Sequence, residues 1–129
     1  MKTETRVVVI GGGVVGISTL YHLTKKGWSD CVLIERKELT SGSTWHAAGL
    51  LPLFNMSYSV SQLHRYSVGL YETLEEETGL NAGLRQVGNI RLATNQDRMD
   101  EYHQYAGVAA TLGVEVNFLS PEEIKDLWP

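Results

Sequence analysis

Three glycines near the N-terminus have the spacing of a turn that binds nucleotide phosphates. Gly11, Gly13 and Gly16 directly follow the apolar run 7–10 in the order Gly-x-Gly-x-x-Gly. In this pattern the first glycine permits a tight turn, the second lets a pyrophosphate approach the backbone, and the third lets a helix pack closely on a strand. The helix N-terminus that follows supplies amide donors and the positive end of a dipole. A chance turn could contain the same glycines, but the strand–turn–helix context favours a dinucleotide site.

An acidic residue follows the second apolar run of the chain. Glu35 lies 24 residues after Gly11, at the end of the run 31–34. A carboxylate at this position accepts hydrogen bonds from ribose hydroxyl groups and repels a ribose 2′-phosphate. Taken alone, Glu35 could be an ordinary surface acid, but its place in the pattern favours the ribose role. These features do not distinguish a flavin from a nicotinamide dinucleotide.

The elements that must position these residues form a βαβ unit. The β-branched run 6–10 predicts a parallel strand buried on both faces. Residues 14–26 predict an amphipathic helix, and residues 31–35 predict the second strand. The fold class is therefore α/β, a Rossmann-like unit that forms an incomplete doubly wound parallel sheet.

The second half of the chain predicts an alternation of helices and strands that belongs to a different segment. We expect a helix over 57–78, a strand over 86–94, a helix from 94 or 95 to 112, a strand over 114–119 and a last helix that Ser120 caps. Residues 1–56 would then hold the βαβ unit and its loop, and residues 57–129 would begin an inserted α+β substrate-domain segment. Because a doubly wound sheet normally has five or more strands, we expect the chain to be the N-terminal piece of a longer protein.

Composition limits the function classes further. The chain has 129 residues, a net charge of −4 and no long basic cluster, which argues against nucleic acid and anionic membranes as partners. No apolar run approaches the roughly 20 residues of a membrane span, and the polar N-terminus predicts a cytoplasmic protein without a signal peptide. Cys31 is expected to be a small buried strand residue. His22, His64 and His103 lack metal-ligand spacing, so no metal site is predicted.

The stretch after Glu35 carries a family resemblance. Glu35-Arg36 followed by Ser-Gly-Ser-Thr at 41–44 resembles the flavin-dependent amine oxidoreductases of the D-amino-acid oxidase superfamily. The run Ser-Thr-Trp-His-Ala-Ala-Gly-Leu at 43–50 resembles more narrowly the dimethylglycine dehydrogenase and sarcosine dehydrogenase family. The resemblance continues through 70–79 and 88–94, so it covers nearly the whole chain.

The resemblance implies FAD as the cofactor and assigns a set of contacts to it. Those residues are Gly11, Gly13, Val14, Val15, Gly16, Glu35, Arg36, Gly42, Ser43, Thr44, Trp45, His46, Ala47, Ala48, Gly49 and Leu50. In that family the histidine of the Ser-Thr-Trp-His run is bonded covalently to a methyl group on the flavin's benzenoid ring, and the matching residue is His46. A neutral imidazole is a nucleophile near pH 7. The alternatives are a loop histidine that only forms hydrogen bonds, and a Trp45 that packs in the core instead of shielding the ring.

The resemblance also implies a reaction. The whole protein would demethylate dimethylglycine or sarcosine oxidatively, with tetrahydrofolate as a further cofactor and an electron-transfer flavoprotein as a partner. The catalytic acid or base is expected beyond residue 129, so residues 1–129 alone should be inactive. Eukaryotic relatives would reside in the mitochondrial matrix. Two alternatives stay open: another FAD-dependent amino-acid or amine oxidase that uses oxygen, and a non-catalytic regulatory relative that lacks the flavin-linking histidine. His46 speaks against the second.

Overall fold

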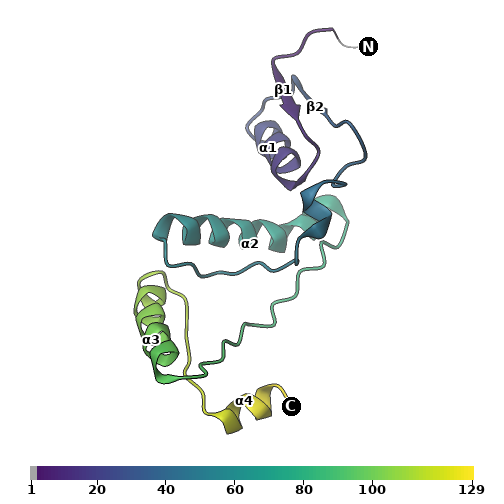
Figure 1. The fold of residues 1–129 in the computed structure, drawn as a ribbon. Helices are drawn as coiled ribbons and strands as arrows, with labels where there is room; N and C mark the ends of the chain where they lie inside the picture. Colours follow the sequence, from purple (N-terminus) through teal and green to yellow (C-terminus); the bar gives the residue numbers. More distant parts are fainter. Residues whose placement is uncertain (1–2) are drawn as a thin grey trace. The chain divides into compact units, whose positions relative to one another are not determined.

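The computed structural model describes residues 3–129. It divides the chain into two compact units, Met1–Leu50 and Leu51–Pro129, which we call the N-terminal and the C-terminal unit (Figure 1). The domain boundary that the sequence suggests between residues 56 and 57 stays a prediction, because compact units need not coincide with domains.

The N-terminal unit is a βαβ unit. Strand β1 (Val7–Ile10) pairs in parallel with β2 (Cys31–Ile34), with Val7 opposite Cys31 and Ile10 opposite Ile34. Helix α1 (Val14–Lys25) connects the two strands and packs on both of them. A 3₁₀ turn, η1 (Ser43–His46), follows in the loop after β2. The predicted α/β class with a parallel sheet is confirmed.

Burial of β1 differs from the prediction. Val7 and Val9 are half-buried, whereas Val8 is 48% exposed and Ile10 is 85% exposed. The alternation arises because successive side chains of a strand point to opposite faces, and among the described residues of this unit α1 covers one face only. The expected burial on both faces is therefore wrong for the described residues.

Helices form the C-terminal unit. They are α2 (Tyr58–Thr78), α3 (Gln96–Thr111) and α4 (Pro121–Leu127). Their ends follow the local signals of the sequence: Gly79 has a left-handed φ of 73°, the Asn95 side chain accepts a hydrogen bond from the Arg98 amide, and Ser120 forms a capping box with Glu123.

The strands predicted over 86–94 and 114–119 are wrong. Neither segment is a strand in the structure, and the sheet of the described residues consists of β1 and β2. A strand exists only when a neighbouring chain segment supplies backbone hydrogen bonds. The alternation of apolar residues in both segments is real, but no described segment pairs with either of them.

Candidate dinucleotide-binding site

The glycine turn between β1 and α1 is closed tightly. Gly11 has a φ of +107°, a conformation that favours glycine. A Cβ atom on Gly16 would lie 1.9 Å from the Gly11 carbonyl oxygen and 3.4 Å from a methyl group of Val9. The first turn of α1 therefore packs directly on the glycine turn and the end of β1, which is the arrangement that the first and third glycines of the fingerprint provide.

The N-terminus of α1 suits an anion. Its N-cap residue is Gly13, which has no side chain to accept a hydrogen bond, and its first turn contains no acidic residue. A Cβ atom on Gly13 would lie 3.0 Å from the Thr44 hydroxyl oxygen, so a side chain there would crowd this end of the helix. The positive end of the helix dipole and the absence of a side chain at Gly13 fit a pyrophosphate group.

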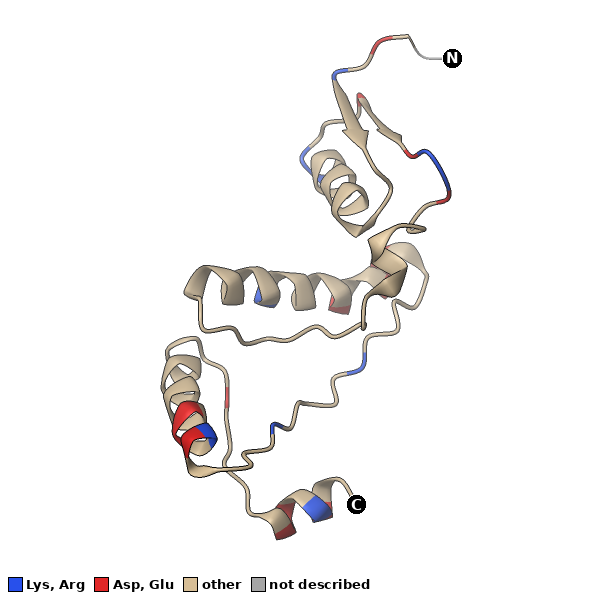
Figure 2. Ribbon diagram, viewed as in Figure 1, with Lys and Arg blue, Asp and Glu red and all other residues tan. Residues whose placement is uncertain are grey.

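The Glu35 carboxylate joins the glycine turn to the loop after β2. Its Oε2 atom accepts a hydrogen bond of 2.7 Å from the Gly12 amide, and its Oε1 atom accepts one of 2.9 Å from the Lys37 amide. These two bonds, the Gly12 bond first, hold the pKa of Glu35 below its ordinary value of 4.5. Carboxylate oxygens have about four lone-pair sites between them, so Glu35 can still accept from a ribose hydroxyl group. Figure 2 shows basic residues directly after β2, where Arg36 and Lys37 follow this carboxylate.

Acid should break the bond between Glu35 and Gly12. Because the folded-state pKa of Glu35 is depressed, its stabilising effect is fully present above pH 4.5 and is lost as the pH falls through the lower folded-state value. We expect the Gly12 amide proton shift to titrate below pH 4.5 in the wild type, and to stay flat in Glu35→Gln. Glu38→Gln, in the same loop, should leave the titration unchanged. A Gly12 titration that survives Glu35→Gln would contradict this assignment.

The loop 41–50 carries the remaining predicted contacts. Its turn η1 is closed by a hydrogen bond of 3.2 Å from the Ala47 amide to the Thr44 carbonyl oxygen. Trp45 is 67% exposed, and its ring centroid lies 4.1 Å from that of His46 at an interplanar angle of 37°. His46 is exposed as well. The tilted contact holds the two rings together.

The structure brings only part of the predicted set together. Six of its members meet around the glycine turn through the contacts above and through a hydrogen bond of 2.9 Å from the Val14 amide to the Thr44 hydroxyl oxygen: Gly11, Gly13, Val14, Gly16, Glu35 and Thr44. The remaining members are exposed and make no hydrogen bond to the turn: Val15, Arg36, Gly42, Ser43, Trp45, His46, Ala47, Ala48, Gly49 and Leu50. Their assignment to the cofactor stays a prediction.

Two residues outside the predicted set belong to this site. Gly12 is buried, its carbonyl oxygen accepts a hydrogen bond of 2.9 Å from the Thr40 amide, and a Cβ atom on it would lie 2.6 Å from a methyl group of Leu39. Thr40 has a φ of 65°, which is rare for a β-branched residue. Gly12 occupies a variable position of the fingerprint, but three glycines in a row were a signal that this position is crowded too. No sequence signal marks Thr40.

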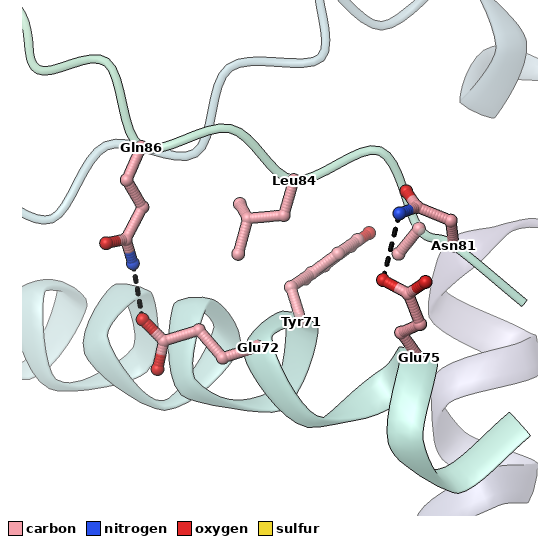
Figure 3. Close-up of a pocket in the computed structure, with 7 residues that line it drawn as sticks. Tyr71, Glu72, Glu75, Asn81, Leu84 and Gln86 are labelled. Carbon is pink, nitrogen blue, oxygen red and sulfur yellow. Dashed lines mark hydrogen bonds between the residues drawn. The ribbon is translucent and has the colours of Figure 1, made fainter. Parts of the chain in front are cut away.

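A separate pocket lies in the C-terminal unit. It has a volume of about 290 Å³ and is formed by α2 and the segment 81–86 (Figure 3). Gln86 donates a hydrogen bond to Glu72, and the Asn81 side-chain amide donates one of 2.9 Å to Glu75. These bonds tie the segment to the helix.

Within residues 3–129 no cluster of three or more His, Cys, Asp or Glu side chains could hold a metal ion. No described helix is long and apolar enough to cross a membrane.

The βαβ unit and the glycine turn are typical of dinucleotide-binding proteins, and comparison with known proteins gives the family. The chain belongs to the family of FAD dependent oxidoreductases called DAO, whose model matches residues 6–129. The solved L-amino acid deaminase from Proteus vulgaris has the same fold, with a TM-score of 0.82 at 18% identity over 97% of this chain and 30% of that one.

Two relatives with higher sequence identity indicate a narrower group within this family. Rattus norvegicus dimethylglycine dehydrogenase, mitochondrial, is 46% identical over 99% of this chain and 15% of its own length. Homo sapiens sarcosine dehydrogenase, mitochondrial, is 46% identical over 100% of this chain and 14% of its own length. The predicted family resemblance is confirmed. The chain spans about 15% of the length of these relatives.

Proposed function

We propose that this chain is the FAD-binding N-terminal part of an oxidoreductase that demethylates N-methylated glycine, either dimethylglycine or sarcosine. The observation that supports the cofactor is the N-terminus of α1, which has no N-cap side chain and no acidic residue in its first turn, with Glu35 bonded to the adjacent Gly12 amide. Likeness to the two dehydrogenases supports the substrate class.

Different residues of the chain would bind different parts of the cofactor. The amides at the start of α1 other than that of Val14, which donates to Thr44, would bind the pyrophosphate. The Glu35 carboxylate would accept from the adenosine ribose, and Val14 and Val15 would line the ADP part. The loop 42–50 would wrap the pyrophosphate and the flavin. The isoalloxazine ring, when bound, supplies the acceptor for a hydride equivalent from the N-methyl carbon; the chain binds and orients it.

His46 would hold the flavin by a covalent bond. The bond would join an imidazole nitrogen to the carbon of a methyl group on the benzenoid ring. The exposure of His46 supports this role, because its ring is accessible to a ligand beside Trp45.

Later steps belong to other parts of the protein. The iminium product would hydrolyse or pass its one-carbon unit to tetrahydrofolate in a C-terminal region, and an electron-transfer flavoprotein would accept the electrons. The catalytic acid or base would lie beyond residue 129. We place the protein in a reducing compartment, the cytoplasm or, in eukaryotes, the mitochondrial matrix.

The cofactor can be tested on the purified protein. It should be yellow, its absorbance should match that of an oxidised flavin, and dimethylglycine or sarcosine should bleach it without reducing added NAD. A colourless protein that reduces NAD would exclude the flavin. A flavoprotein whose bleached form is reoxidised directly by oxygen at the catalytic rate would favour an amine oxidase instead.

A further inference from the structure

Thr44 attaches the loop that carries His46 to the start of α1. Within residues 41–50, all of which the structure describes, Thr44 is the one residue whose side chain is not exposed. Its hydroxyl oxygen accepts a hydrogen bond of 2.9 Å from the Val14 amide, thirty residues earlier in the chain. The loop is therefore attached to the start of α1 at one defined point.

This bond satisfies one of the helix amides that have no partner within the helix. The first amides of a helix have no partner within the helix, and a Ser, Thr, Asp or Asn at the N-cap normally accepts from them. Here the N-cap is Gly13, and no N-cap side chain bonds to the helix. Thr44 supplies the oxygen from outside, and the absence of a side chain at Gly13 leaves room for it, since a Cβ atom there would lie 3.0 Å from that oxygen.

The same residue also closes the turn. The Thr44 carbonyl oxygen accepts from the Ala47 amide at 3.2 Å, so one end of Thr44 holds α1 and the other end holds η1. Trp45 and His46 lie between these two attachments, with their rings in contact. The position of the imidazole relative to the glycine turn therefore depends on Thr44.

We infer that Thr44 is a positioning residue: its hydroxyl group fixes the turn that carries Trp45 and His46 to the N-terminus of α1, and so sets where the His46 imidazole meets the flavin. The flavin part of this inference rests on the proposed function. The attachment of the turn to the helix does not, because it concerns contacts within this chain.

The attachment is tested first on the intact protein purified without flavin. In Thr44→Val, peptides containing Val14 and Ala47 should both exchange amide hydrogen about five- to tenfold faster, since one hydrogen bond is lost at the helix and the turn loses its anchor. Thr44→Ser should restore slow exchange, and Ser41→Ala, an exposed hydroxyl residue of the same loop, should change neither peptide. Unchanged exchange at Val14, or faster exchange at Val14 alone, would overturn the inference.

The positioning of His46 is tested on the same variants loaded with FAD. The rate at which bound flavin becomes resistant to release by acid should fall about five- to tenfold in Thr44→Val and recover in Thr44→Ser. Equal rates in the wild type and Thr44→Val, or equal defects in both variants, would overturn the positioning role. If the wild type releases all its flavin in acid, the proposed covalent bond has failed, and the exchange measurements alone decide whether Thr44 holds the turn.

Discussion

Replacement of His46 by alanine should eliminate covalently held flavin. After denaturation in acid, the wild-type polypeptide should stay yellow, and a proteolytic peptide containing Trp45, His46 and Ala47 should carry the additional mass of FAD. The alanine variant should release all of its flavin, yet it should still bind FAD loosely, because the glycine turn and Glu35 remain. Turnover should fall, because a histidyl substituent withdraws electrons from the ring and raises its reduction potential.

His103→Ala is the matched control for this experiment. His103 stacks on Phe118 at a centroid distance of 4.2 Å in the C-terminal unit, outside the predicted cofactor contacts. Its replacement should leave the flavin attached. Complete release of flavin from the wild type in acid would remove the covalent role of His46 and widen the proposed function to the amine oxidases that hold flavin without this bond.

A valine at position 13 should lower the affinity for FAD by roughly a hundredfold while the fold persists. Its Cβ atom would lie 3.0 Å from the Thr44 hydroxyl oxygen, and its two methyl groups would enter the space that a pyrophosphate needs. The loss corresponds to one or two hydrogen bonds to a charged group. Glu35→Ala should also lower flavin occupancy, because it would remove the proposed hydrogen bond to the ribose and the bond from the Gly12 amide. Flavin occupancy and circular dichroism of each variant separate cofactor loss from unfolding.

A substitution at Gly16 should lower the stability of the fold, whereas the valine at position 13 should lower the affinity for FAD. A Cβ atom there would lie 1.9 Å from the Gly11 carbonyl oxygen, so Gly16→Ala forces backbone to move and should destabilise the fold by about 1–3 kcal/mol. Gly69→Ala is the control, because nothing lies within 4 Å of a Cβ atom at that position.

Normal FAD occupancy in both Gly13→Val and Glu35→Ala would show that the fingerprint does not contact the cofactor.

The elements that depend on local chemistry could be predicted from the sequence. The strand–turn–helix at Gly11 follows from an apolar run next to three glycines, and the helix ends at Gly79 and Ser120 follow from residues that favour those conformations. The strands over 86–94 and 114–119 could not be predicted in this way, because their alternation is a local property whereas pairing requires a partner elsewhere.

The site shows the same limit at the level of single atoms. The sequence places Glu35 at the end of β2, but its bond to Gly12 depends on the loop that brings the two together. Thr44 could be assigned to the cofactor by resemblance, yet its bond to Val14 joins residues thirty positions apart and has no sequence signature. Contacts of this kind follow from the path of the loop, which no residue of the loop specifies alone.

The hydrogen bonds at Gly12 bear on the thermodynamics of cofactor binding. Its amide donates to Glu35, and its carbonyl oxygen accepts from Thr40, which is held at a left-handed φ of 65°. These bonds join residues of this chain only, so they form as the chain folds. Ordering the backbone of one residue costs about 1–2 kcal/mol in free energy at 25 °C, through the loss of conformational entropy. A left-handed threonine adds about 1–2 kcal/mol of strain. Both costs are incurred during folding. Under the proposed function the dinucleotide would therefore meet a preorganised loop, and less of its binding free energy would be spent on ordering the protein.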